Sequence, residues 1–129
     1  LETNLISVVE PIKHEGSIAA MDSGILVDLS LGGGRLISKN DFGYEKNRLN
    51  LAVKLDVAGI NQVLKVKCQI RVQEIQSLEQ IKSSLQYCTP VSKLKAEYLY
   101  VYGLKFEGLS NEKLILLTAY ILEHRAVPG

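Results

Sequence analysis

The chain has 129 residues, of which 47% are hydrophobic and 22% charged, with no tryptophan and 3 prolines. This composition is typical of a single soluble globular domain that buries a core without disulfides or metals, and it excludes a disordered chain. A formal net charge of +1, without charged blocks, gives no reason to expect a nucleic-acid partner. The sequence shows no signal peptide and no apolar run of about 18 residues, so we expect a cytoplasmic protein without membrane insertion.

The domain is predicted to occupy residues 1–125, followed by a linker or tail at 126–129. Because the chain starts at Leu1 and not at a methionine, we interpret it as a fragment of a longer protein. The two cysteines, Cys68 and Cys88, are not expected to form a bridge, since Cys68 falls in an alternating strand pattern where it acts as a small apolar residue.

The first third of the chain reads as short strands at residues 5–12, 17–20, 24–31 and 35–38. These segments are apolar or β-branched, and turn residues such as Pro11, Gly16 and the Asp22-Ser23-Gly24 run separate them. Three glycines at positions 32–34 join one strand to the next. A dinucleotide or phosphate loop would instead lead into a helix, so that class of site is not expected.

A regular alternation of apolar and polar residues begins at Leu49 and predicts two antiparallel strands, at 49–56 and 64–73, joined by a hairpin connection at 57–61. A period of two indicates one buried and one wet face. The buried face of the return strand is predicted to carry Leu64, Val66, Cys68, Ile70 and Val72, and its wet face Lys65, Lys67, Gln69, Arg71 and Gln73.

The last third predicts one more strand and a helix. Alternate residues from Tyr98 to Phe106 share one strand face, which Gly108 ends. Residues 74–95 form either an amphipathic helix or a protruding extended hairpin. A helix over 111–124 follows, capped by Ser110 or Asn111, and it carries too many apolar residues for a single stripe. It is therefore either clasped on two sides or buries a second face against a partner. The whole pattern predicts a six- or seven-stranded antiparallel β-barrel with a C-terminal α-helix.

The most distinctive segment is the turn at residues 25–35, where a carboxylate, a hydroxyl and a glycine cluster stand between two apolar runs. Its spacing, Asp28-x-Ser30-x-x-Gly33, resembles the Asp/Asn-x-Ser-x-x-Gly signature of the PilZ domain, a bacterial receptor module for cyclic di-GMP. The closing strand and helix, from Tyr102 to Leu122, resemble the same family. The resemblance implies that Asp28 accepts guanine N–H groups, that Ser30 bonds in either direction, and that Gly33 lets the backbone approach a flat ring. From the residues alone, these side chains could equally bond backbone groups in a turn while the glycines supply positive φ.

One part of the family's pattern is missing. PilZ domains also carry an Arg-x-x-x-Arg pair upstream of the turn, but no arginine precedes Arg35 in this chain. Two lost bidentate contacts, each worth about 1–3 kcal/mol, would weaken binding by roughly 30-fold to more than 10,000-fold. Either the pair lies upstream of Leu1, or Arg35 or a lysine such as Lys39 replaces it, or the ligand has been abandoned.

Two functions follow from the resemblance. The first is a cyclic di-GMP effector that regulates motility or biofilm formation, with Asp28, Ser30, Gly33 and Arg35 as ligand-binding residues. The second is a degenerate PilZ-like module that binds a protein partner, a neighbouring domain or a second copy through its apolar C-terminal helix. No enzyme, cofactor or metal site is predicted, because His14 and His124 stand alone and neither cysteine has a motif partner.

Overall fold

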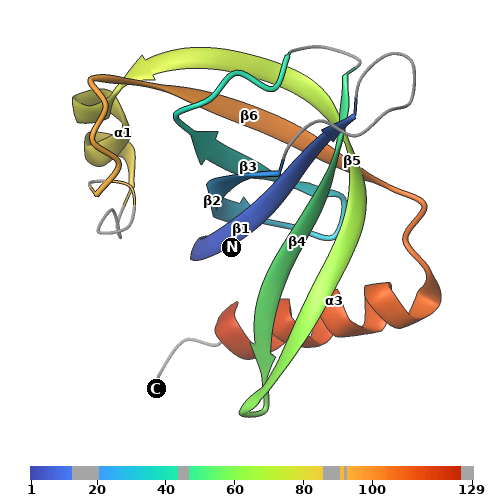
Figure 1. Cartoon of the computed structure of the whole chain (residues 1–129). Coiled ribbons are helices and arrows are strands. Elements are labelled where there is room, and N and C mark those ends of the chain that lie inside the picture. The colour runs from blue at the N-terminus through green and yellow to red at the C-terminus, as the bar shows by residue number, and fades with distance from the viewer. Residues whose placement is uncertain (13–20, 44–46, 86–90, 92, 126–129) are drawn as a thin grey trace.

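The computed structural model describes residues 1–12, 21–43, 47–85, 91 and 93–125. Six antiparallel strands close into a barrel in the order β1-β2-β3-β6-β5-β4, and a long helix follows the last strand (Figure 1). The elements are β1 (Glu2–Ile12), β2 (Asp22–Leu29), β3 (Gly33–Ser38), β4 (Arg48–Val57), β5 (Ile60–Ser77), α1 (Leu78–Ser84), β6 (Tyr98–Glu107) and α3 (Asn111–Arg125). The predicted antiparallel barrel with a C-terminal helix is confirmed, with six strands.

Most predicted elements lie where the sequence placed them, although their ends differ by a few residues. The strand expected at 24–31 runs two residues earlier, and the one expected at 35–38 starts two residues earlier. The connection predicted through three glycines is a tight turn from one strand to the next. Gly33 and Gly34 already belong to β3. The strand expected at 17–20, His14 and Cys88 lie outside the described residues.

The β4–β5 hairpin is the most regular part of the barrel. Its ten register pairs run without a break from Arg48↔Gln69 to Val57↔Ile60. The two-residue loop between the strands consists of Ala58 and Gly59, with φ of 53° and 78°. Two positive φ values in succession are typical of a type I′ turn, which matches the right-handed twist of the paired strands.

Three register irregularities interrupt the rest of the barrel. Strand β1 shifts relative to β2 between Glu2 and Leu5, β2 shifts relative to β3 between Leu26 and Asp28, and β5 shifts relative to β6 between Ile70 and Val72. The shift in β5 makes part of the predicted alternation wrong. Val72 is 49% exposed rather than buried, and Gln73, predicted on the wet face, lies 3.3 Å from the hydroxyl of the buried Tyr102. A bulge adds one residue to one strand, so every later side chain changes face.

The main core fills the barrel. Fully buried leucines from β2, β3, β4 and β5 meet there with Tyr102 and Phe106 of β6 and with Leu117 and Tyr120 of α3. Tyr102 is enclosed but satisfied, because its hydroxyl accepts from Phe42 N and donates to Asn40 O, both at 2.8 Å. Cys68 belongs to this core as a free, fully buried thiol, as the sequence predicts.

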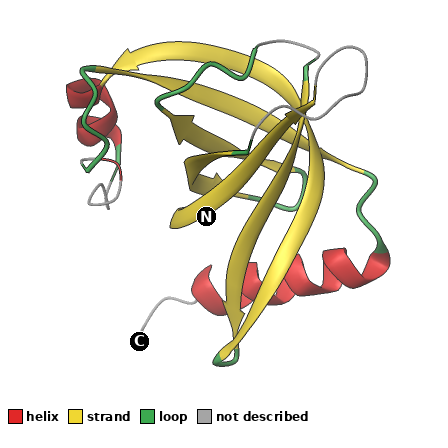
Figure 2. Ribbon diagram, viewed as in Figure 1, coloured by secondary structure: helices red, strands yellow, loops and turns green. Residues whose placement is uncertain are grey.

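A second apolar cluster lies on the outer face of the barrel, beneath α1. It explains why β6 is apolar on both faces, because Leu99 and Val101 point outward into this cluster while Tyr102 and Leu104 point into the barrel. The other members are Ile25, Val27, Ile37, Ile81 and Val91. Figure 2 shows the short helix α1 at the end of the long β5–β6 ribbon, away from α3.

The described part of the segment predicted at 74–95, which excludes residues 86–90 and 92, combines both alternatives. Strand β5 continues to Ser77, which pairs with Tyr98, and only then does the chain turn into α1. A capping box begins this helix, since Gln80 N donates to Ser77 Oγ and Ser77 N donates to Gln80 Oε1.

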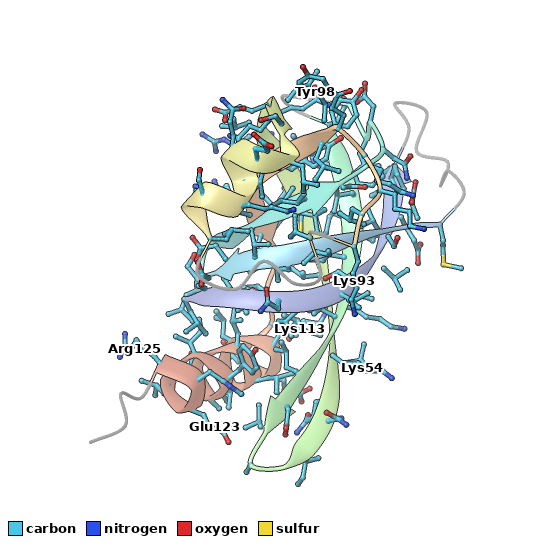
Figure 3. The ribbon with its side chains drawn as sticks, turned by 90° about the vertical axis from the view of Figure 1, so that its left-hand side faces the viewer. Lys54, Lys93, Tyr98, Lys113, Glu123 and Arg125 are labelled. Atoms are coloured by element: carbon cyan, nitrogen blue, oxygen red, sulfur yellow. The ribbon has the colours of Figure 1, made fainter. Side chains whose placement is uncertain are left out.

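Helix α3 covers one end of the barrel and contacts the β4–β5 hairpin at its own C-terminus (Figure 3). Ser110 Oγ accepts from Lys113 N at 3.3 Å, which confirms Ser110 as the cap. At the far end, the Glu123 carboxylate accepts from Ala58 N at 2.9 Å, and His124 Nε2 lies 2.8 Å from Asp56 O.

The helix is not clasped on two sides within the described part of the chain. Its inner face buries Leu117 and Tyr120, whereas Ile115 and Leu122 are 69% and 55% exposed. No helix among the described residues has the length and apolar character needed to cross a membrane.

Candidate ligand-binding site

The turn between β2 and β3 is built around Ser30 and Gly33. Ser30 N donates to Gly33 O at 2.8 Å, and Ser30 Oγ donates to the same oxygen at 3.2 Å. Gly32 O accepts from Phe106 N at 2.8 Å, which ties the turn to β6. Ser30 therefore has a structural role in closing the turn, while its hydroxyl oxygen keeps lone pairs that can accept a further bond.

A turn often requires glycine because its backbone adopts a positive φ, but this is not why the glycines are present here. None of the three has a positive φ, so that explanation of the glycine cluster is wrong. A Cβ on Gly33 would collide with the carbonyl oxygen of Leu104, and one on Gly34 would lie 2.6 Å from Asp28 O. Both glycines are needed because neighbouring backbones approach them closely. A Cβ on Gly32, in contrast, would meet nothing within 4 Å.

Asp28 faces outward because of the irregularity in β2. Leu26 and Leu29 both point into the main core, and Val27 points into the outer cluster. The extra residue between the two inward leucines allows Asp28 to reach the surface beside Val27, which is the usual effect of a β-bulge. Its carboxylate is 54% exposed, and Oδ1 lies 3.2 Å from Leu1 N.

These groups surround an open depression of about 460 Å³ on the outer surface of the barrel. The four residues predicted as ligand-binding are brought together there. Lys39, the other candidate cation, lies past the end of β3 and does not line the depression. The full lining consists of Asp28, Ser30, Gly32, Gly33, Gly34, Arg35, Arg71, Gly103, Leu104 and Lys105.

Two further cationic residues line this site, Arg71 and Lys105, and the motif indicates neither of them. The alternation predicts Arg71 only as part of a wet strand face, and Lys105 belongs to no predicted site. They lie 36 and 70 residues from Arg35 along the chain, but β6 pairs with both β3 and β5, which places all three beside the depression. The cross-strand pair Gly33↔Lys105 links the turn directly to β6. The available sequence signal was the placement of both residues at outward positions of predicted strands.

The depression is predominantly positive. Arg35, Arg71 and Lys105 line it together with a single carboxylate, that of Asp28. Within the described residues, no ion pair involves any of the three cations. A surface with unpaired guanidinium and ammonium groups, one carboxylate and closely approachable backbone suits a ligand that carries both anionic groups and N–H donors.

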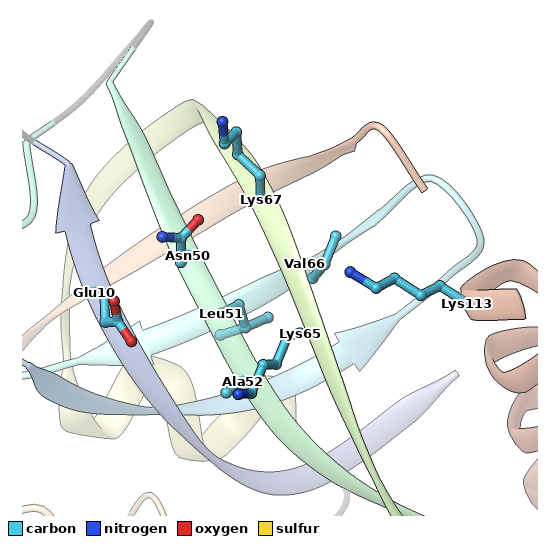
Figure 4. A pocket seen from close by; sticks show the side chains of 8 residues that line it. All are labelled: Glu10, Asn50, Leu51, Ala52, Lys65, Val66, Lys67 and Lys113. Carbon is cyan, nitrogen blue, oxygen red and sulfur yellow. The ribbon is translucent and has the colours of Figure 1, made fainter. Parts of the chain in front are cut away.

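A second hollow of about 340 Å³ lies over β4 and β5 beside the start of α3 (Figure 4). It also contains cations, namely Lys65, Lys67 and Lys113, but Glu10 lines it as well. No glycine contributes to it, and no part of the predicted motif lies there.

No protein-family model matches the sequence, and no curated protein matches it significantly. Solved structures share its fold, including MotI/DgrA of Bacillus subtilis and the PilZ domain of YcgR of Escherichia coli. The structure of the Bacillus subtilis inhibitor of motility (MotI/DgrA) superposes with a TM-score of 0.60 at 12% identity, covering 97% of this chain and 48% of that one. The PilZ domain of YcgR from Escherichia coli with c-di-GMP superposes with a TM-score of 0.55 at 16% identity, covering 93% of this chain and 83% of that one.

The chain has a PilZ-like fold. The likeness extends over nearly the whole chain, which spans about half the length of MotI/DgrA. At these identities the similarity concerns the fold, so the ligand must be inferred from the residues of the depression. Among the described residues of this PilZ-like domain, no group of three His, Cys, Asp or Glu side chains is placed to hold a metal ion.

Proposed function

We propose that this domain is a cyclic di-GMP-binding effector in bacterial second-messenger signalling, and that the ligand occupies the depression beside the β2–β3 turn. The observation that carries the proposal is the convergence of Asp28, Ser30, Gly33 and Arg35 on one positively charged surface. The similar YcgR domain is a PilZ domain with c-di-GMP, which supports this choice of ligand.

The chemistry of the lining fits a guanine nucleotide. The exposed Asp28 carboxylate can accept the N–H donors of a guanine base, and the Ser30 hydroxyl can accept a further bond. Arg35 offers a planar fork of donors for a phosphate or for the O6 and N7 acceptors of guanine. The Gly32 position is open, so a flat ring can approach the backbone there.

Binding at this site would affect the first strand, because Leu1 N lies 3.2 Å from both Asp28 Oδ1 and Leu29 O. A ligand that competes for the Asp28 carboxylate changes how the start of β1 is held. We propose that this is how binding changes contacts with a partner or neighbouring domain. The setting we propose is cytoplasmic control of motility or biofilm formation; the neighbour MotI/DgrA is an inhibitor of motility.

Calorimetric titration with cyclic di-GMP, and with GTP as the control ligand, tests the proposal. The titration uses this chain and, where the gene encodes residues ahead of Leu1, a version extended by them, because PilZ domains carry an Arg-x-x-x-Arg pair upstream of the turn. We expect Asp28→Ala and Ser30→Ala to weaken binding at least about tenfold, as the loss of a hydrogen bond to a charged or polar ligand group predicts. Asp56→Ala, on the distant β4–β5 hairpin, serves as the matched control. Absence of binding by both forms would overturn the proposal.

A second candidate function, in which the domain does not bind nucleotide and acts as a protein-interaction or dimerisation module, is favoured by the outer face of α3. Ile115 and Leu122 lie seven residues apart on one helix face and are largely exposed. Sedimentation without nucleotide tests this candidate. It predicts concentration-dependent association that Ile115→Lys abolishes and that Ser83→Lys, on the exposed surface of α1, leaves unchanged.

A further inference from the structure

The bulge in β5 places a cation opposite the predicted turn. Ile70, which precedes the bulge, points into the core, and Val72, which follows it, is 49% exposed. Arg71 lies between them and lines the depression together with Lys105 of β6. From this arrangement we infer that Arg71 and Lys105 bind the phosphodiester groups of the ligand. The inference rests on the proposed function, and it assigns phosphate binding to strands β5 and β6 in addition to any contribution from upstream arginines.

A row of paired residues crosses the depression. Asp28 of β2 pairs with Arg35 of β3, and Arg35 pairs with Gly103 of β6. On its other side, Gly103 pairs with Val72, immediately after the bulged Arg71. Since β3 and β5 both neighbour β6, their backbones are about 10 Å apart at this point. Arg35 and Arg71 therefore flank Gly103 from opposite sides, within reach of one small anionic ligand.

Gly103 keeps the space between the two arginines open. Its φ is not positive, and a Cβ built there would lie 3.4 Å from Val72 Cβ, a distance close to ordinary contact. Neither backbone conformation nor a close backbone approach therefore requires glycine at this position, in contrast to Gly33. The missing side chain leaves the β6 backbone bare between Arg35 and Val72, the residue that follows Arg71.

The cations of the depression are available for a ligand. Arg48, elsewhere on the barrel, has its Nε 2.9 Å from Glu107 Oε1, whereas the described residues provide no such partner for Arg71 or Lys105. Three unpaired cations and one carboxylate leave an excess of two positive charges around the site. Cyclic di-GMP carries two phosphodiester groups, each with one negative charge, so the ligand and the site are complementary in charge.

The test compares Arg71→Gln, Lys105→Gln and the double variant with wild type by calorimetric titration of cyclic di-GMP, in whichever of the two chain lengths binds. Lys65→Gln and Arg125→Gln, which remove equal charges away from the depression, are the matched controls. We expect about a tenfold rise in Kd for each single variant and about a hundredfold rise for the double variant, with the controls within twofold. Unchanged thermal midpoints would exclude loss of folding as the cause.

Two further readouts separate direct contact from a structural role. Raising the salt concentration should weaken binding by wild type more steeply than binding by the double variant, because screening acts on the removed charges. Gly103→Glu, which places a carboxylate between the arginines, should abolish binding, and Gly103→Ala should bind nearly as wild type does.

The inference is overturned if Asp28→Ala loses binding while Arg71→Gln and Lys105→Gln retain wild-type affinity; in that case the proposed function stands. If neither chain length binds cyclic di-GMP, the proposed function fails, and the inference fails with it.

Discussion

The β4–β5 hairpin and the depression beside the β2–β3 turn are parts of the same barrel, but they are built in opposite ways. The hairpin has ten unbroken register pairs, and burial alternates along residues 48–56 of β4 and 63–70 of β5. The depression lies between two register shifts, one in β2 and one in β5, and five of its ten lining residues are Gly32, Gly33, Gly34, Gly103 and the bulge residue Arg71. Regular pairing produces a core, whereas irregular pairing brings polar side chains and bare backbone to one surface.

This contrast predicts that substitutions in the two regions have different consequences. Core substitutions near the hairpin should lower stability without changing the ligand affinity of the folded protein. Polar substitutions in the depression should change affinity with little effect on stability. The glycines of the turn are the exception, since two of them are required by strand packing.

The largest effect is expected for Leu64→Ala in the hairpin. Leu64 is 1% exposed in the main core, and truncating a buried leucine costs about 2–5 kcal/mol of the free energy of unfolding. Urea denaturation measures the loss, and Val63→Ala, at a neighbouring position that is 53% exposed, is the control, with an expected change below about 0.5 kcal/mol. Equal losses in the two variants would contradict the assignment of the core.

The next largest loss of stability is expected for Gly33→Ala. This variant tests whether strand packing requires glycine at this position of the depression. The added Cβ would collide with Leu104 O, a backbone atom, so β3 and β6 must separate. We expect a cost of roughly 1–3 kcal/mol, the range for overpacking, measured as a lower thermal midpoint. Gly32→Ala is the matched control, because a Cβ there meets nothing within 4 Å. A Gly33→Ala variant as stable as Gly32→Ala would show that Gly33 serves the ligand alone.

A smaller change in stability, dependent on pH, is expected from Cys68 in strand β5 of the hairpin. Burial, with a lesser contribution from the Glu107 charge, raises the pKa of the Cys68 thiol from 9.0 to about 12. The unfolded chain loses this proton first, so the stabilisation is complete below pH 9 and is lost as pH rises from 9 towards 12. The free energy of unfolding should fall by at most about 1.4 kcal/mol per pH unit in this range.

Urea denaturation between pH 8 and 10 measures this dependence, and Cys68→Val provides the comparison. The variant keeps a buried apolar side chain of similar size but has no thiol to ionise. Its stability should therefore fall less steeply with pH than that of wild type. Parallel pH profiles for the two proteins would contradict a protonated, buried thiol.

The smallest effect is expected at the hairpin turn. Ala58 has a φ of 53°, a conformation that asparagine adopts more readily than alanine. Ala58→Asn should raise the free energy of unfolding by about 0.5 kcal/mol, visible as a small rise of the thermal midpoint. A lower midpoint would argue against a type I′ turn at this position.

Local patterns in the sequence were sufficient to predict the regular features of the barrel. Alternation with a period of two predicted β4 and the first part of β5, with Leu64, Val66, Cys68 and Ile70 correctly placed inside. Turn and capping residues predicted the end of β6 and the start of α3 at Ser110. The motif predicted Asp28, Ser30 and Gly33 as one site, with Arg35 as a candidate replacement for the missing arginine pair, and all four line one depression. These features depend on local patterns, which a chain carries in its own order of residues.

The remaining features depend on how the strands are arranged in three dimensions. The bulge between Ile70 and Val72 reversed the faces predicted for Val72 and Gln73, because an unpaired residue depends on the neighbouring strand and not on local alternation. The need for glycine at position 33 follows from the backbone of Leu104, which lies too close to leave room for a Cβ. Arg71 and Lys105 line the site because β6 lies between β3 and β5. This strand order follows from closure of the barrel. Strand order is a long-range property, and no spacing within the sequence contains it.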